Sequence, residues 1–206
     1  MTDPNSTLVQ PCRNYGMTTL GRILERNAVW WPDRDAFVLG DRRQTYRTLY
    51  DRSSRLAAAL EGIGTLRQDR IGMLSTNSIE YFEFFSAAEI AGFIATPVSF
   101  RAAPPEIEYL VSDSGIAVLF FERDYAAVVD GLRPKLGQVR HYVCIGGDAP
   151  AWAFDYEALL ASGDPQGPVN RATPEDIAHL FYTSGTTGKP KGVPLGQSNQ
   201  VLSARS

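Results

Sequence analysis

Hydrophobic positions along this chain change their spacing several times, and each change predicts a new element. A first helix begins at a capping hydroxyl, Thr18 or Thr19, and ends before Pro32; its apolar face comprises Leu20, Ile23, Leu24 and Ala28. The segments 36–39 and 44–46 flank a polar turn, 40–43, and predict a hairpin. A second helix follows, with Leu49, Leu56, Ala59 and Leu60 facing inward.

After Gly64 the chain alternates between β and α patterns. We expect strands over 70–74, 93–98, 116–121 and 140–145, with helices over 79–91, from Pro104 and over 125–132 between them. A short helix over 154–160 is also expected. The alternation predicts an α/β fold with a doubly wound, largely parallel sheet flanked by helices.

Two parts are expected along the chain. Residues 1–65 would form an N-terminal helix-hairpin-helix segment that packs on a downstream subdomain, and residues 66–206 would form the α/β subdomain. Trp30 and Trp31 close the first helix, and their large apolar surface favours a place in the core.

A small polar loop lies between two apolar runs near the end of the chain and predicts strand, phosphate loop, strand. Its glycines, Gly185 and Gly188, allow backbone angles that a side chain would forbid, so that several N–H groups can face one anion. Hydroxyls and ammonium groups that suit phosphate oxygens come from Thr183, Ser184, Thr186, Thr187, Lys189 and Lys191.

A Walker-type phosphate loop is excluded. That loop needs G-x-x-x-x-G-K-[ST] and a helix that starts at the lysine. Here the glycines are closer together, and Pro190 restricts Lys189 away from helix.

The order T-S-G-T-T-G-K-P-K-G over 183–192 resembles the signature loop of the adenylate-forming (ANL) superfamily, which includes AMP-binding acyl-CoA synthetases and acyl-AMP ligases. The alternative is a hairpin that is merely rich in glycine, threonine and lysine; a hairpin, however, has no reason to need two lysines and four hydroxyls. Weaker likenesses, such as P-D-R-x-A over 32–36, extend the resemblance to about Leu20–Asn199.

The resemblance implies an ATP-dependent carboxylic acid:CoA ligase. In such enzymes a small carboxylic acid attacks the α-phosphate of Mg-ATP, pyrophosphate leaves, and a thiol, often coenzyme A, takes the acyl group from the adenylate. By resemblance, the loop from Thr183 to Gly188, together with Lys189, would grip the phosphates of ATP. Lys189 and Lys191 would supply catalytic charge, and the Thr183 hydroxyl would contact Mg2+.

Three departures from the family pattern stand out. Gln68 replaces a usual glycine, which we expect to be a turn change of little consequence. Ala103 replaces a capping threonine, so the helix from Pro104 should start less stably by about 1 kcal/mol. Gly196-Gln197 stands where the family has Ser or Thr followed by His, which puts the usual acyl contact in doubt.

The chain holds no match to the family's later adenine, ribose, hinge and C-terminal lysine motifs. We therefore expect the N-terminal part of a ligase that is catalytically incomplete by itself. The alternative is a non-catalytic nucleotide-binding or interaction module. Either should expose apolar surface before about residue 65, and hence self-associate or depend on the missing C-terminal region.

Composition excludes several other classes. The chain has 206 residues, of which 44% are hydrophobic, and a formal charge of −3, which gives no general attraction to nucleic acid. Neither a signal peptide nor a membrane span is apparent, so a cytoplasmic protein is expected.

The isolated cysteines and histidines indicate neither a metal site nor a redox pair. Cys12 and Cys144 form no C-x-x-C pair and should be reduced and structural. His179 shares a strand face with Ile177 and Phe181, which favours packing over catalysis. A serine hydrolase is not supported either, because the sequence lacks the G-x-S-x-G motif.

Overall fold

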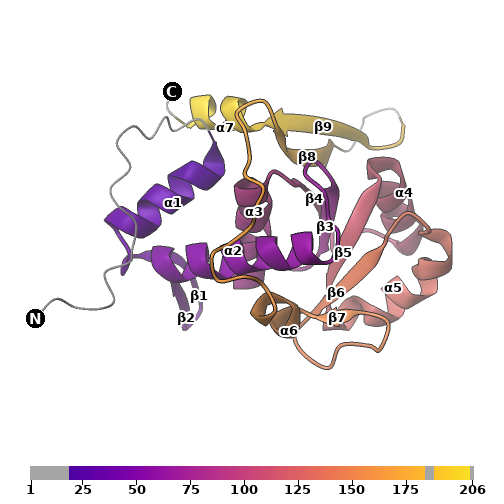
Figure 1. Ribbon diagram of the computed structural model, residues 1–206. Helices are drawn as coiled ribbons and strands as arrows, with labels where there is room; N and C mark the ends of the chain where they lie inside the picture. Colours follow the sequence, from indigo (N-terminus) through magenta and orange to yellow (C-terminus); the bar gives the residue numbers. More distant parts are fainter. Residues whose placement is uncertain (1–18, 184–187, 205–206) are drawn as a thin grey trace, which may run out of the picture.

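A computed structural model describes residues 19–183 and 188–204. Its main feature is a 7-stranded sheet with the order β7-β6-β5-β3-β4-β8-β9 (Figure 1). All neighbouring strands are parallel except β8 and β9. The strands are β3 (Arg70–Leu74), β4 (Ile94–Val98), β5 (Ile116–Glu122), β6 (His141–Ile145), β7 (Phe154–Asp155), β8 (Ile177–Thr183) and β9 (Lys191–Gly196). The predicted doubly wound, largely parallel sheet is confirmed.

Helices cover both faces of this sheet. One face packs on α2 (Tyr46–Gly62), α3 (Ile79–Ala91) and α6 (Tyr156–Ala161), and the other on α4 (Pro104–Ser114) and α5 (Ala126–Leu132). Short 3-10 helices, η1 (Arg123–Tyr125) and η2 (Arg133–Lys135), flank α5. In β5, Val118 and Phe120 enter the first layer while Leu119 and Phe121 enter the second. This two-sided burial explains the uninterrupted apolar run of β5.

The first helix and the hairpin that follows it pack against α2 and α3 (Figure 1). In α1 (Leu20–Trp30), the Thr19 hydroxyl accepts a hydrogen bond from the Arg22 N–H at 3.3 Å, as the capping pattern predicts. The hairpin of β1 (Asp35–Leu39) and β2 (Arg42–Thr45) is confirmed. It contacts α3 through Phe37 and Phe82, whose ring centroids lie 3.6 Å apart.

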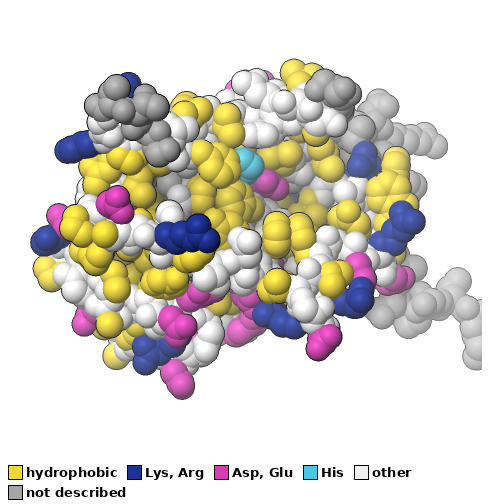
Figure 2. Space-filling view, turned by 180° about the vertical axis from the view of Figure 1, so that it is seen from behind, with side chains coloured by type: hydrophobic (Ala, Val, Ile, Leu, Met, Phe, Trp, Pro, Cys, Tyr) yellow, Lys and Arg dark blue, Asp and Glu magenta, His cyan; other side chains and the backbone are white. Residues whose placement is uncertain are grey.

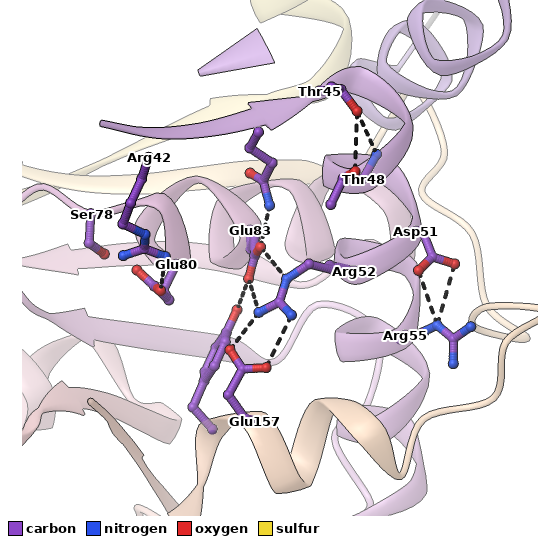
Figure 3. Close-up of polar contacts among 12 residues, drawn as sticks. Arg42, Thr45, Thr48, Asp51, Arg52, Arg55, Ser78, Glu80, Glu83 and Glu157 are labelled. Carbon is purple, nitrogen blue, oxygen red and sulfur yellow. Dashed lines mark hydrogen bonds and ion pairs between the residues drawn. The ribbon is translucent and has the colours of Figure 1, made fainter. Parts of the chain in front are cut away.

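Buried ionic contacts join the helices on this side of the sheet (Figure 3). The Glu83 carboxylate of α3 is buried and accepts hydrogen bonds from Arg52 of α2 at 2.6 Å and from the Tyr156 hydroxyl of α6 at 2.5 Å. Gln44 of the hairpin also donates to Glu83. A buried carboxylate is costly unless it is paired. Glu83 therefore fixes α2, α3, α6 and the hairpin relative to one another.

Three local expectations differ from the structure. Trp30 and Trp31 are 60% and 39% exposed, so their predicted core position is wrong. The reason is that α1 buries Gly21 and Leu24, near its other end. The segment predicted as a helix over 154–160 begins with the short strand β7, and the unpredicted helix α7 (Gln197–Ser203) follows β9.

Among the residues that the structure describes, no helix is long and apolar enough to cross a membrane.

Candidate functional site

The polar loop connects β8 to β9 at one end of the sheet. These strands pair in antiparallel register, with Thr183 opposite Lys191 and Phe181 opposite Val193. Because β8 is parallel to β4, Thr183 lies at the edge where the parallel strands end. In open α/β sheets, ligands bind at this carboxyl edge.

Four of the predicted site residues lie within the described part of the chain: Thr183, Gly188, Lys189 and Lys191, all of them exposed. The other four, Ser184, Gly185, Thr186 and Thr187, lie outside the described residues. The two flanks of the loop thus come together at one end of the β8–β9 pair.

Gly188 is the one loop glycine that lies within the described residues. A Cβ placed there would meet no atom of the described residues within 4 Å, its chain neighbours left aside. That the loop glycines turn backbone N–H groups toward an anion stays a prediction.

The charge around the loop suits an anion. No carboxylate of residues 19–183 and 188–204 forms an ion pair with Lys189 or Lys191, whereas the chain's third lysine, Lys135, pairs with Glu108 at 2.8 Å. The described part of the chain also holds no cluster of three His, Cys, Asp or Glu residues suited to a metal. Two ammonium groups without a carboxylate partner among these residues fit the phosphates of a nucleotide.

Helix α4 holds both flanks of the loop, a role that the sequence reasoning missed. Before the loop, the Tyr182 hydroxyl donates to Asp113 Oδ2 at 2.7 Å. After it, the Tyr109 hydroxyl donates to the Pro190 carbonyl at 3.0 Å, and the Lys189 Nζ lies 5.0 Å from the centroid of the Tyr109 ring. Tyr109 and Asp113 are four residues apart and so share one face of α4. That spacing was the only signal in the sequence.

Both phenols are donors over a wide pH range. Burial, and then the Asp113 carboxylate, raise the pKa of Tyr182 and also that of Tyr109. A raised pKa keeps a phenol protonated at neutral pH. The two hydrogen bonds that hold the loop flanks therefore persist at neutral pH.

Gln68 fixes the other end of β8, contrary to our expectation of little consequence. Its side-chain Oε1 accepts from the Ile177 N–H at 3.0 Å, while its Nε2 donates to the Ile177 carbonyl at 3.1 Å and to the Gly92 carbonyl at 2.9 Å. Its φ is +66°, in the region that favours glycine. The amide thus pairs with the first residue of β8 as a neighbouring strand would.

Gln197 points into the protein. The side chain is fully buried, and its Oε1 accepts from the Leu20 N–H at 2.9 Å, at the start of α1. His179, as predicted, is packed: it is 9% exposed, pairs with Glu89 at 3.0 Å and contacts the Phe85 and Phe181 rings. Gln197 therefore joins helices and does not face the loop.

Comparison with known proteins is consistent with this geometry. The family model of AMP-binding enzymes matches residues 24–206. The chain is 36% identical over 192 residues to the medium-chain acyl-CoA ligase Mig of Mycobacterium avium, covering 85% of this chain and 35% of that protein. It is 33% identical over 182 residues to the long-chain-fatty-acid–CoA ligase FadD13 of Mycobacterium tuberculosis, covering 86% of this chain and 35% of that protein.

Solved structures agree. The crystal structure of the anthranilate CoA ligase AuaEII in complex with anthranoyl-AMP matches with a TM-score of 0.86 and 28% identity, over 91% of this chain and 36% of that one. The N-terminal domain of FACL13 from Mycobacterium tuberculosis matches with a TM-score of 0.77 and 30% identity, over 87% of this chain and 44% of that one. The chain thus spans about a third of the length of the curated relatives it matches. With the signature loop at the carboxyl edge of a doubly wound sheet, and a family model that matches most of its length, this chain belongs to the AMP-binding enzymes of the adenylate-forming superfamily.

Proposed function

We propose that this chain is the N-terminal part of an ATP-dependent acid–thiol ligase, which joins a carboxylic acid to AMP and then to the thiol of coenzyme A. The observation that carries the proposal is the β8–β9 loop, where Lys189 and Lys191 stand exposed without a carboxylate partner among the described residues. The acyl-CoA ligases among its relatives support the enzyme over a non-catalytic module.

The loop would hold the triphosphate of ATP while the bond to the α-phosphate breaks. Pyrophosphate carries away several negative charges, so ammonium groups at Lys189 and Lys191 would stabilise the leaving group. Backbone N–H groups and hydroxyls of residues 183–188 would add hydrogen bonds to the same oxygens.

The Thr183 hydroxyl, at the end of β8, would be a ligand of Mg2+, which would supply positive charge to offset that of the phosphates. The assignment is supported by the position of Thr183, which is exposed and lies opposite Lys191 in the strand register. Mg2+ prefers such oxygen ligands and keeps several waters. The acid and coenzyme A would be bound with residues of the remaining two thirds that the relatives possess.

Acid-dependent exchange of labelled pyrophosphate into ATP tests the proposal in the protein that contains this region. We expect Lys189→Gln to slow exchange by a factor of about 100 or more, the cost of losing one aligned charge-stabilising contact. Gly188→Ala should also slow exchange, because its Cβ would occupy space proposed for the phosphates. Lys135→Gln is the matched control, since that lysine pairs with Glu108 outside the loop. Unchanged exchange in both loop variants would refute the assignment.

A further inference from the structure

One aromatic residue from outside the signature sequence, Tyr109, contacts the part of the loop that leads into β9. Tyr109 of α4 is 81 residues from Pro190 in sequence, yet its hydroxyl donates to the Pro190 carbonyl at 3.0 Å. The Lys189 ammonium lies 5.0 Å from the centre of the same ring. A single side chain therefore contacts both the backbone and the charge at this end of the loop.

The two contacts act differently. The hydrogen bond fixes the backbone at Pro190, the residue that follows Lys189. The ring attracts the ammonium group through its quadrupole and leaves its charge unneutralised, unlike a carboxylate. Lys189 is thus held near the loop and stays fully positive for an anion.

The same helix fixes the other flank. Asp113, one turn after Tyr109, accepts from the Tyr182 hydroxyl at 2.7 Å, and Tyr182 directly precedes Thr183. Helix α4 also packs on the sheet through the buried residues Ile107, Leu110 and Val111. A helix anchored on the sheet by its buried face therefore sets the distance between the two ends of the loop.

The geometry points to Tyr109 as a positioning residue for Lys189 in phosphate binding, and this inference rests on the proposed function. Because the ring and the hydroxyl hold the lysine in place before the nucleotide arrives, less conformational freedom is lost on binding. Loss of the ring lowers the affinity for a triphosphate without removing any charge.

The three lysines of the chain make a direct test possible. Reductive dimethylation keeps their charge and labels Lys135, Lys189 and Lys191 with 13C-methyl groups for NMR, and Lys189→Arg identifies the Lys189 signal. We expect the Lys189 methyl signal to be shifted upfield by the Tyr109 ring. The shift should persist in Tyr109→Phe, disappear in Tyr109→Leu, and be unaffected by Tyr125→Leu, which removes a ring from the same apolar layer.

Binding of MgATP to the unlabelled chain is measured in parallel by calorimetry. Tyr109→Leu should weaken it about two- to fivefold, the range for one exposed cation–π contact, and Tyr109→Phe should restore most of the loss. The inference is overturned if the Lys189 signal of the wild type is not shifted upfield, or if its upfield shift remains in Tyr109→Leu. Absence of MgATP binding by the wild type instead counts against nucleotide binding by the chain, while the methyl signal still decides whether Tyr109 holds Lys189.

Discussion

At the scale of single residues, Gln68 shows how a side chain can offset an unfavourable backbone. A positive φ costs a non-glycine residue about 1–2 kcal/mol. The three hydrogen bonds of its amide to Ile177 and Gly92 contribute about 1 kcal/mol each. Glutamine is therefore a stable choice where a glycine would be expected, because it adds contacts that glycine lacks.

Glu80 gives a pH dependence at the same scale. Burial alone would raise the pKa of Glu80, but hydrogen bonds, above all from Arg42, and the Arg42 charge hold that pKa below its ordinary value of 4.5. The Arg42 Nη2 lies 2.6 Å from Glu80 Oε1 and joins the hairpin to α3 (Figure 3). Because the folded pKa is depressed, this contribution is complete above the unfolded value of 4.5 and is lost as the pH falls through the folded value.

We predict that Glu80→Gln lowers the free energy of unfolding by up to about 1 kcal/mol near neutral pH, since Arg42 is largely exposed. Urea unfolding at several pH values should show the difference from wild type shrinking below pH 4.5. In an Arg42→Met background the effect should be smaller. A difference that grows as the pH falls would contradict the assigned sign.

At the scale of elements, two helices meet at a glycine. A Cβ on Gly21 of α1 would lie 2.6 Å from the Glu89 carbonyl oxygen and 2.8 Å from Ile90 Cα, both backbone atoms of α3. Close approach of α1 to α3 therefore requires that α1 carry no side chain at this point. Leu24, Leu49 and Ile90 then form a small apolar cluster beside the contact.

Gly21→Ala should destabilise the fold by about 1–3 kcal/mol, because the backbone of α3 cannot yield as a side chain would. Gly62→Ala, at the end of α2, is the matched control: its Cβ meets no atom of residues 19–183 and 188–204 within 4 Å, and alanine favours helix by about 1 kcal/mol. Urea midpoints of the two variants should move in opposite directions. Equal shifts would show that the α1–α3 contact is looser than the structure indicates.

At the scale of the whole molecule, large apolar side chains remain on the surface around α1 and the hairpin. Trp30 is 60% exposed, Val38 51% and Leu39 43%. Phe82 of α3 is 39% exposed and Phe181 of β8 is 37% exposed. Figure 2 shows hydrophobic side chains exposed over wide parts of one face of the molecule. Large exposed apolar patches mark interaction or association surfaces.

The 206-residue chain should accordingly self-associate at micromolar concentration and bind a hydrophobic dye. Light scattering of wild type and of a Trp30→Ser, Val38→Ser double variant measures this, and the variant should be less associated. Leu66→Ser, which changes an exposed leucine in the loop after α2, is the control. A monomeric wild type that binds no dye would remove the argument for a covering partner.

The sequence by itself determined the order of the main elements up to β9, short strand β7 excepted, together with the sheet class and the identity of the loop. Those follow from side-chain periodicity, from capping residues such as Thr19, and from a run of ten residues, all of which are local. Tertiary structure decided which distant residues serve the loop. Tyr109 reaches Pro190, and Gln68 reaches Ile177, because the sheet order places β8 beside β4, and no local pattern specifies that neighbour. The exposure of Trp30 was decided the same way, because the packing of α1 on α3 determines which face of the helix is covered.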